Sequence, residues 1–245
     1  MTAGDRSLLA GTVSARVAAL DWGVIAGELD RNGAAVAGPL LTPSECDHLI
    51  ALYDQDAHFR SRIVMARHGF GSGEYKYLDY PLPAPVQELR EALYSQLAPI
   101  ASDWVRRMGG ETQFPGAHAD FLDRCRAAGQ VRPTPLILKY QAGDYNCLHQ
   151  DLYGDTVFPI QVAILLSQPV SDFTGGEFLV VEQRPRMQSR PEVVSLGQGE
   201  AVIFAVNERP VAGSRGDYRV KIRHGVSRVR SGRRHTLGVI FHDAS

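Results

Sequence analysis

The sequence has few cysteines and no long apolar run. Its 3 cysteines stand far apart in a chain of 245 residues, at Cys46, Cys125 and Cys147, which excludes a disulfide framework and a zinc knuckle. No apolar run approaches the roughly 18 residues of a membrane-spanning helix. The first residues mix charges into apolar positions and lack a secretory pattern. We therefore expect a cytoplasmic protein with reduced thiols that does not enter a membrane.

The chain also lacks a strong overall charge. A net charge of −1 with 44% hydrophobic residues is typical of an ordinary globular protein and unlike a strongly basic nucleic-acid-binding domain. The charge is uneven, because residues 180–245 hold 12 basic residues against 6 acidic ones. This basic third either faces an anionic ligand or forms a solvated surface.

No internal repeat, low-complexity tract or linker divides the chain, so we expect residues 1–245 to form one domain. Residues 1–132 read mainly as helices. Asp21 and Thr42 are expected to cap two of them. A third spans residues 85–108 and is expected to break or restart at Pro99, and a fourth ends at Gly129. Between them, "FRSRIVM" and "EYKYLDY" predict a hairpin around a glycine-bearing loop.

Residues 133–245 change to a β pattern. Short segments rich in β-branched and aromatic residues alternate with Gly, Pro, Asp and Ser, as in "PLILKY", "FPIQVAILL", "GEFLVVE", "PEVVSL", "EAVIFAV", "YRVKIRHGV" and "RRHTLGVIFH". About eight short strands over this length predict a sandwich or jelly roll. The expected fold class is α+β, with a jelly-roll core buttressed by the N-terminal helices.

Two His-x-Asp triplets are candidates for half of a metal site. His118 and Asp120 fall in a predicted helix, where residues two apart point about 200° from one another. We expect them to be surface residues of that helix. His149 and Asp151 fall at a predicted strand, where residues two apart share a face. Only the second pair has the geometry to hold one ion.

A third ligand and an anion-binding arginine complete a known pattern. His224 follows Asp151 by 73 residues and Arg234 follows His224 by ten. With these spacings the sequence resembles the Fe(II)/2-oxoglutarate-dependent dioxygenases, whose metal-binding strand carries His-x-Asp and whose distal histidine precedes an arginine. The resemblance covers residues 133–243 and extends to Tyr140, Gly143, Gly175-Gly176, "GQGEAVIF" and Arg234-His235-Thr236, and more weakly to "LLTPSEC".

The resemblance implies a double-stranded β-helix and a set of cofactors. His149, Asp151 and His224 would be the metal ligands and catalytic centre, because two imidazoles and one carboxylate occupy one face of Fe(II) and leave three positions open. There 2-oxoglutarate and O2 would react, giving succinate, CO2 and a hydroxylated C–H bond. Arg234 would bind the distal carboxylate of 2-oxoglutarate, with Thr236 and Tyr140 as hydroxyl donors.

Each of these residues also has an ordinary structural interpretation. His224 could pack as a strand histidine, Tyr140 as a core tyrosine and Thr236 as a strand former. Arg234 lies in a cluster with other arginines, any of which could be the true anion ligand, namely Arg228, Arg230 and Arg233. Asp155 is an alternative carboxylate, but it follows a turn predicted at Gly154.

The sequence says less about the substrate than about the metal site. Stretches such as "RHGFGSGEYKY" and "EQRPRMQSRPE" resemble a bacterial group of this superfamily described as oxygenases of damaged, alkylated nucleic acid. Two segments supply candidate substrate residues. The first is an aromatic and basic stretch that also includes Tyr80, and the second is a basic loop; the candidates in them are Tyr75, Lys76, Tyr77, Arg184, Arg186 and Arg190. Arg219, Lys221 and Arg223, which alternate on one face of a predicted strand, support this interpretation. If the substrate is nucleic acid, we expect the loop and strand to surround the mouth of the metal site. A half-buried hairpin and a solvated loop are the alternative.

Three functions stay open on the sequence alone. The first is oxidation of alkylated bases, although the Arg-x5-Arg pattern of base-demethylating dioxygenases is absent. The second is hydroxylation of a small molecule or a protein side chain, which the prolyl-hydroxylase-like spacing favours. The third is a jelly-roll metal-binding or sensor protein without turnover.

Overall fold

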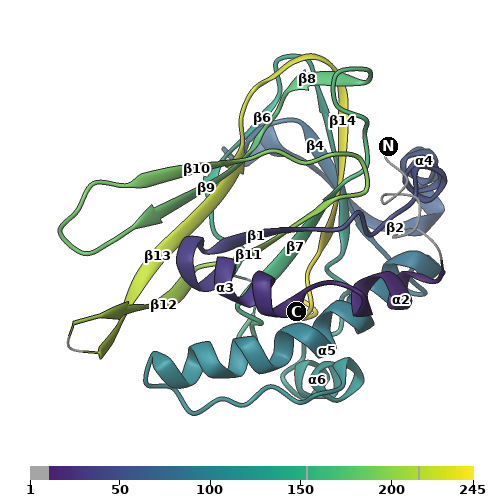
Figure 1. Cartoon of the computed structure of the whole chain (residues 1–245). Helices are drawn as coiled ribbons and strands as arrows, with labels where there is room; N and C mark the ends of the chain where they lie inside the picture. Colours follow the sequence, from purple (N-terminus) through teal and green to yellow (C-terminus); the bar gives the residue numbers. More distant parts are fainter. Residues whose placement is uncertain (1–10, 153, 215) are drawn as a thin grey trace.

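The computed structural model describes residues 11–152, 154–214 and 216–245. Along the described chain, the helices all precede residue 128, and most of the strands follow residue 135 (Figure 1). The described helices are α2 (Val13–Ala18), α3 (Trp22–Asn32), α4 (Pro43–Leu52), α5 (Ala84–Arg107) and α6 (His118–Ala127), with 3-10 turns η1 (Asp56–His58) and η2 (Met65–Arg67). None of the described helices combines the length and the apolar character that a membrane span requires.

The strands form two antiparallel sheets. The major sheet has the order β1-β11-β7-β14-β5-β4-β2, with β8 beside β14, and the minor sheet has the order β10-β9-β13-β6-β3, with β12 beside β13. Their bounds are β1 (Ala34–Ala37), β2 (Phe59–Val64), β3 (Gly71–Ser72), β4 (Glu74–Leu78), β5 (Leu136–Gln141), β6 (Tyr145–His149), β7 (Ile160–Leu165), β8 (Phe173–Gly175), β9 (Phe178–Gln183), β10 (Arg190–Val194), β11 (Ala201–Ala205), β12 (Glu208–Gly213), β13 (Gly216–Val226) and β14 (Val229–Val239).

The predicted α+β fold with a jelly-roll core is confirmed. Every predicted β segment from residue 136 onward forms a strand, and the predicted hairpin pairs β2 with β4. The apolar run "FPIQVAILL" becomes β7, whose six residues are all buried between two neighbours in the major sheet. The short strands β1, β3, β8 and β12 were not predicted, because they lack an alternating apolar pattern of useful length.

Local capping signals set the helix ends. The side chain of Asp21 accepts a hydrogen bond from the backbone N–H of Val24, and Gly33 ends α3 in the left-handed region with φ of 76°. At α4, Thr42 and Glu45 form the predicted capping box, each accepting from the backbone of the other.

The expected break at Pro99 is wrong. Helix α5 runs through this residue without interruption for 24 residues. A proline inside a helix removes one backbone hydrogen bond. Tertiary packing outweighs that loss, because the turns on either side of Pro99 bury Leu93, Leu97, Ala101 and Trp104. Helix α5 contacts α2, α6, β12 and β14, so it braces the sheets from one side, as Figure 1 shows.

A short strap, residues 70–73, joins the two sheets at the edge of their shared interior. Gly71 pairs with Asn146 of the minor sheet, and three residues later Glu74 pairs with Lys139 of the major sheet. Gly73 has φ of 122°, and a Cβ there would lie 2.9 Å from Cδ1 of Tyr140. Only glycine fits this close crossing without strain. The strap therefore closes one side of the space between the sheets.

Candidate metal centre

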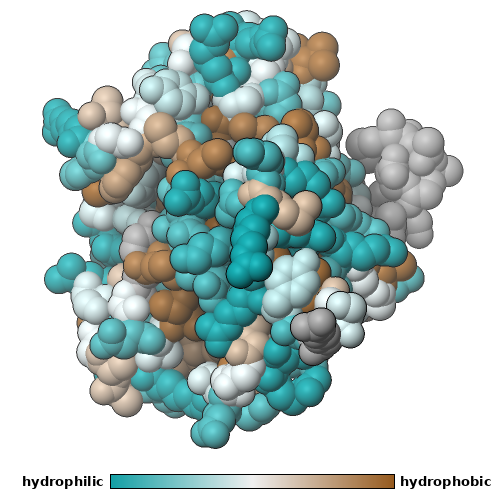
Figure 2. Space-filling view, turned by 90° about the vertical axis from the view of Figure 1, so that its left-hand side faces the viewer, coloured by the Kyte–Doolittle hydropathy of each residue, from teal (hydrophilic) through white to brown (hydrophobic). Residues whose placement is uncertain are grey.

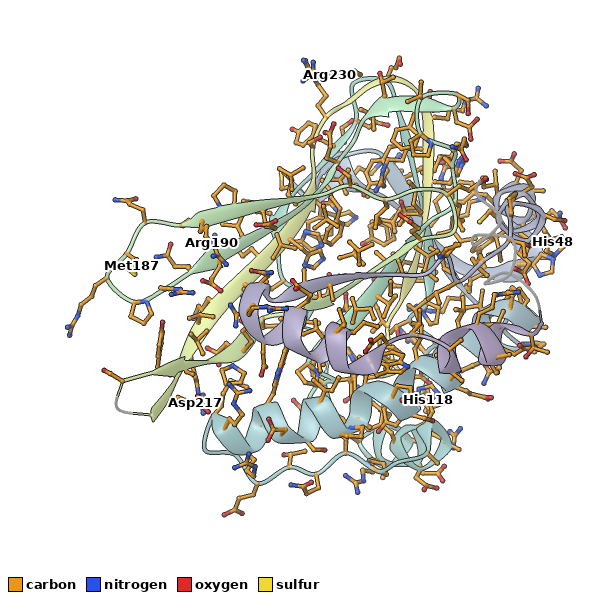
Figure 3. All side chains as sticks on the ribbon, viewed as in Figure 1. His48, His118, Met187, Arg190, Asp217 and Arg230 are labelled. Carbon is orange, nitrogen blue, oxygen red and sulfur yellow. The ribbon has the colours of Figure 1, made fainter. Side chains whose placement is uncertain are left out.

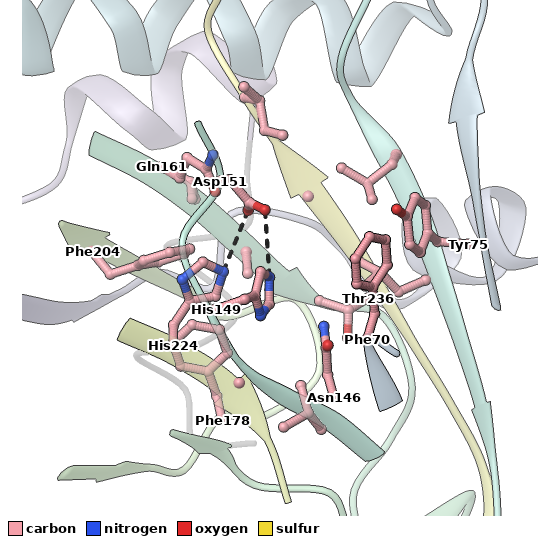
Figure 4. A pocket seen from close by; sticks show the side chains of 18 of the residues that line it. Phe70, Tyr75, Asn146, His149, Asp151, Gln161, Phe178, Phe204, His224 and Thr236 are labelled. Carbon is pink, nitrogen blue, oxygen red and sulfur yellow. Dashed lines mark ion pairs between the residues drawn. The ribbon is translucent and has the colours of Figure 1, made fainter. Parts of the chain in front are cut away.

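His149, Asp151 and His224 meet between the two sheets. His149 ends β6 and pairs directly with His224 of β13. One carboxylate oxygen of Asp151 lies 3.4 Å from Nε2 of His149, and the other lies 3.4 Å from Nε2 of His224 (Figure 4). One donor atom from each of the three residues lies within 4.8 Å of the other two. Asp151 itself lies just past the end of β6, which corrects the expectation that it belongs to the strand.

Hydrogen bonds orient two parts of this group. Nδ1 of His149 donates to the carbonyl of Cys147 at 2.8 Å, so Nε2, which faces Asp151, is the ring nitrogen left to bind a metal. Gln150 sits between the two ligands in sequence. Its amide donates to Oδ1 of Asn207 at 2.6 Å and to the carbonyl of Ile222 at 2.8 Å. The His-x-Asp segment is therefore fastened to the strand that carries His224.

The three groups perturb one another's protonation. Burial raises the pKa of Asp151, but its contacts with the imidazoles of His149 and His224 outweigh burial and hold that pKa well below its usual range. Burial lowers the pKa of His149, yet the neighbouring carboxylate of Asp151 reverses the direction and the pKa is raised. For His224 burial dominates and the pKa is lowered. Asp151 is thus a carboxylate at neutral pH.

This donor set fits a divalent transition metal. Two imidazole nitrogens and one carboxylate oxygen are the ligands of the 2-His-1-carboxylate iron sites. The triad lines a cavity of about 220 Å³, so one side of the group is open to a further ligand. Among the described residues, these three are the group of His, Cys, Asp and Glu side chains whose donor atoms converge closely enough for one ion.

Arg234 lies in the same cavity and has no carboxylate partner within the described residues. It is 2% exposed, it donates to Oγ1 of Thr236 at 2.5 Å, and its Nε has no hydrogen-bond partner there. Burial lowers its pKa to about 10, so the guanidinium remains charged at neutral pH. Tyr140 stands opposite Arg234 in the register of β5 and β14, and its buried hydroxyl is also unpaired. A buried cation with one unpaired N–H of its own and one unpaired hydroxyl beside it suits a carboxylate ligand.

The cavity contains residues that the sequence reasoning missed. Phe70, Asn146 and Gln161 line it together with Tyr75, Phe178 and Phe204 (Figure 4). Gln161 was detectable as the one polar residue inside the apolar run of β7. Asn146 was not, because a register shift in the pairing of β6 with β13 brings it to the inner face three residues before His149.

The second triplet does not form a site, as expected, but one of its residues is not on the surface. Asp120 is exposed, whereas His118 is 3% exposed and its Nε2 lies 2.8 Å from the carbonyl of Phe241. Burial lowers the pKa of His118 to about 4. The apolar face of α6 explains this, since Phe121, Leu122 and Cys125 are buried beside it. Asp155 is exposed and stands outside the triad.

Of the aromatic and basic stretch, only Tyr75 lines the cavity. Lys76 points to the other face of β4, where its ammonium donates to the carbonyl of Tyr53 and to Asp56, each at 2.7 Å. Lys76 is 6% exposed, so its expected role in substrate binding is wrong. Tyr77 contacts Tyr75 edge-on and carries Arg60 above its ring, and it does not line the cavity.

The basic loop does not surround the mouth, which overturns that expectation. Val180 is the residue of β9 opposite His224, so Arg184 lies about 13 Å further along the strand. Arg184 and Arg190 both contact Glu182, Arg186 lies in the intervening turn, and Figure 3 shows Arg190 and Met187 on the projecting hairpin. Figure 2 looks onto this side of the molecule, which is mainly hydrophilic with hydrophobic patches between.

The basic strand also faces outward. Lys221 and Arg223 are exposed and alternate with buried residues that face the interior. Arg219 donates to the carbonyl of Met108 and lies 3.6 Å from Glu208. None of the three lines the cavity. Tyr80 does not line it either, and its hydroxyl instead accepts from Arg90 and donates to Asp243.

Sequence comparison relates the chain to one oxygenase family. Residues 73–244 match the family model Oxygenase-NA, described as "Oxygenase, catalysing oxidative methylation of damaged DNA". The chain is also 52% identical over 165 residues to an uncharacterized protein of Mycobacterium tuberculosis, Rv2227, covering 67% of this chain and 71% of the relative.

Structure comparison gives the same fold at low identity. A prolyl-4-hydroxylase of Pseudomonas putida superposes with a TM-score of 0.56 at 14% identity, covering 91% of this chain and all of the other. An oxidoreductase of the 2OG-Fe(II) oxygenase family from Burkholderia pseudomallei superposes with a TM-score of 0.52 at 17% identity, covering 91% of this chain and 92% of the other. At these identities the likeness concerns the double-stranded β-helix alone.

Proposed function

Because the chain belongs to the Oxygenase-NA family and shares the fold of a 2OG-Fe(II) oxygenase, we propose that it is a 2-oxoglutarate-dependent dioxygenase that oxidises an alkylated base of nucleic acid. His149, Asp151 and His224 hold the iron in this proposal. The observation that carries it is the convergence of these three side chains in a cavity that also contains a buried guanidinium whose Nε has no hydrogen-bond partner among the described residues.

The protein residues divide into those that hold the metal and those that place the cosubstrate. When bound, Fe(II) supplies the oxidative decarboxylation of 2-oxoglutarate with O2, whose second oxygen atom enters a C–H bond of the substrate. His149 and His224 would hold the ion through Nε2, and the low pKa of Asp151 keeps its carboxylate charged for the same purpose.

Arg234 fixes the far end of the cosubstrate. Its charge is retained by a pKa of about 10, and its side chain is held by Thr236 at 2.5 Å. The Tyr140 hydroxyl stays protonated, because burial raises its pKa, and it can donate to the same carboxylate. Binding there satisfies donors that otherwise remain unpaired in the described protein.

The nucleic-acid substrate rests on the description of the family. Hydroxylation of an N-methyl carbon gives an unstable hemiaminal that releases formaldehyde, so oxidation of such a group removes the methyl. The base must leave the stack to reach the cavity, because the triad lies between two sheets and not on the surface.

A second candidate is a hydroxylase of a small molecule or a protein side chain. This candidate is favoured by the cavity lining. Among the described residues that line the cavity, Arg234 is the only basic side chain apart from the two histidines. Sensing without turnover is not retained, since the chain is an oxygenase by family.

One experiment separates the two substrate classes. The purified protein is incubated with Fe(II), 2-oxoglutarate and either methylated oligonucleotides or proline-containing peptides, and succinate and formaldehyde are quantified. We expect oligonucleotides to stimulate succinate formation with release of formaldehyde in equal amount. Stimulation by peptides without formaldehyde would establish the second candidate instead.

A further inference from the structure

The strap carries an exposed aromatic ring into the cavity. Phe70 is 46% exposed although it lines the same space as the triad. Its backbone is fixed from both sides, because its carbonyl accepts from Cys147 at 2.9 Å and its N–H donates to Met65 at 3.2 Å. His68 stacks on the ring at 5.3 Å between centroids. Figure 4 shows Phe70 beside Tyr75, across the cavity from the histidines.

An exposed ring of this kind needs an occupant that is flat and apolar on its faces. A large hydrophobic side chain loses free energy in contact with water and regains it by stacking on another ring. The backbone of Phe70 is held by two hydrogen bonds and its ring packs on His68, which limits the conformational entropy lost when it binds. Phe70 is therefore suited to stacking on a planar group.

The charges of the cavity select against a cationic ring. Asp151 is the only acidic side chain among the described lining residues, and both of its oxygens face the imidazoles. Glu74, at the start of β4, is engaged on the other side by Arg62. A positive ring placed against Phe70 and Tyr75 would lose its hydration without gaining a carboxylate partner. Stacking of the aromatic rings returns only part of that cost.

The buried amide of Gln161 favours an occupant that carries a hydrogen-bond acceptor. Gln161 is 3% exposed, lines the cavity beside Asp151, and its Nε2 has no hydrogen-bond partner among the described residues (Figure 4). A plain hydrocarbon ring would leave that donor unsatisfied, whereas a ring nitrogen or carbonyl would accept from it. The occupant is thus a heterocycle.

Basic character next to the strap points to a phosphate on the same molecule. Arg67 is exposed three residues before Phe70 and forms no ion pair within the described part of the chain. Its neighbour His68 is exposed as well. Alternating basic and aromatic side chains around a groove are typical of single-strand nucleic-acid binding.

We infer that residues 67–70 are the substrate-receiving element, in which Phe70 stacks on an uncharged alkylated base and Arg67 contacts a phosphate of the same single strand. This inference rests on the proposed function and adds the residues and the charge state of the base that the enzyme accepts. It makes Phe70 a specificity-determining residue.

The test uses two labelled single-stranded oligonucleotides that differ only in the position of one methyl group. One contains N6-methyladenine, which is neutral, and the other contains 1-methyladenine, which is cationic at neutral pH. Binding to the full-length protein is measured by fluorescence anisotropy, which requires no turnover. We expect the neutral base to bind at least about tenfold more tightly, the difference expected when a buried charge lacks a partner.

Substitutions assign the effect to the strap. Phe70→Ala and Phe70→Leu should each weaken binding of the neutral oligonucleotide by about 5- to 100-fold, since both remove the stacking ring and the second keeps apolar volume. Arg67→Ala should reduce the slope of log affinity against log salt by about 0.7 for one lost phosphate contact. Tyr145→Ala is the matched control for the ring, because Tyr145 is 43% exposed and outside the cavity. Arg106→Ala on α5 is the control for charge.

Several results would overturn the inference. They are equal or tighter binding of the cationic oligonucleotide, wild-type binding by Phe70→Ala, or an equal loss in Tyr145→Ala. Succinate formation by the wild-type protein without oligonucleotide, measured separately, reports on the proposed function. If succinate forms and no oligonucleotide binds, the inference fails and the dioxygenase chemistry stands. If oligonucleotide binds and no succinate forms, the proposed function fails.

Discussion

Arg234 faces Tyr140 across the pairing of β14 with β5, while Arg233, the residue before it, is exposed on the other face of the strand. The alternation of a strand thus decides which member of the arginine cluster reaches the cavity.

Arg234→Ala is expected to raise the 2-oxoglutarate concentration needed for turnover by a factor of roughly 30 to several thousand. The loss of a charge-assisted pair from a buried site costs about 2–5 kcal/mol. Iron binding should be nearly unchanged, since Arg234 is not one of the converging donors. Arg233→Ala, measured in the same titration of 2-oxoglutarate, should behave as wild type. A larger loss in Arg233→Ala would show that the strand register is different.

His149→Ala, Asp151→Ala and His224→Ala should each abolish turnover and weaken metal binding while the protein stays folded. Each change removes one of three converging donors. Co(II) binding, followed by visible absorption, measures the loss independently of activity. Asp120→Ala is the control, because the exposed Asp120 lies on α6 and should bind the metal as wild type does. Normal Co(II) binding by His224→Ala would exclude this triad.

Gly176→Ala should impair the cosubstrate site through Arg234. Gly176 has φ of 68°, and a Cβ there would lie 2.8 Å from Cδ of Arg234. The left-handed conformation costs a substituted residue roughly 1–2 kcal/mol, and the contact also displaces the guanidinium. Gly143→Ala is a matched control, since Gly143 has φ of 98° and nothing lies within 4 Å of its would-be Cβ. We expect urea denaturation to show destabilisation of both variants and only Gly176→Ala to need more 2-oxoglutarate.

Stability should fall as the pH is lowered from about 6.5 toward 4. Burial lowers the pKa of His118, His235 and His242 to about 4 in the folded protein. Below pH 6.5 the unfolded chain therefore binds more protons at these residues than the folded chain does. Each buried histidine contributes up to about 3 kcal/mol of stability at neutral pH that is lost across this interval. Urea denaturation at pH 7.5, 6 and 5 measures the trend, and His118→Gln should make it shallower.

The sequence predicts those parts of the site that follow from spacing along strands. His224 and Arg234 belong to strands that are consecutive in the chain, β13 of the minor sheet and β14 of the major sheet, and their separation of ten residues is set by the short connection between these strands. The side on which Lys76 points depends instead on the register of β4 against β5, which no local pattern determines. Asn146 reaches the cavity through an irregularity in strand pairing, and this too leaves no mark in composition.

The sequence does not show how far the basic loop lies from the metal site in the folded protein. Arg184 follows Gly176 closely in the chain, and that proximity suggested the mouth of the site. The hairpin of β9 and β10 instead carries it outward, where Glu182 neutralises part of its charge. The helix over residues 85–108 was predicted, but its continuity through Pro99 was not, because only the packing of α5 against α2 and α6 reveals why the helix continues.

Gln150 ties the His-x-Asp segment to Asn207 and Ile222 by two amide hydrogen bonds that involve no metal. The spacing of the donors is therefore built by the polypeptide before any ion arrives. Many small metal-binding domains fold only around their ion, so that demetallation unfolds them. We therefore expect the protein to stay folded when its metal is removed by a chelator, and to recover activity when Fe(II) is returned.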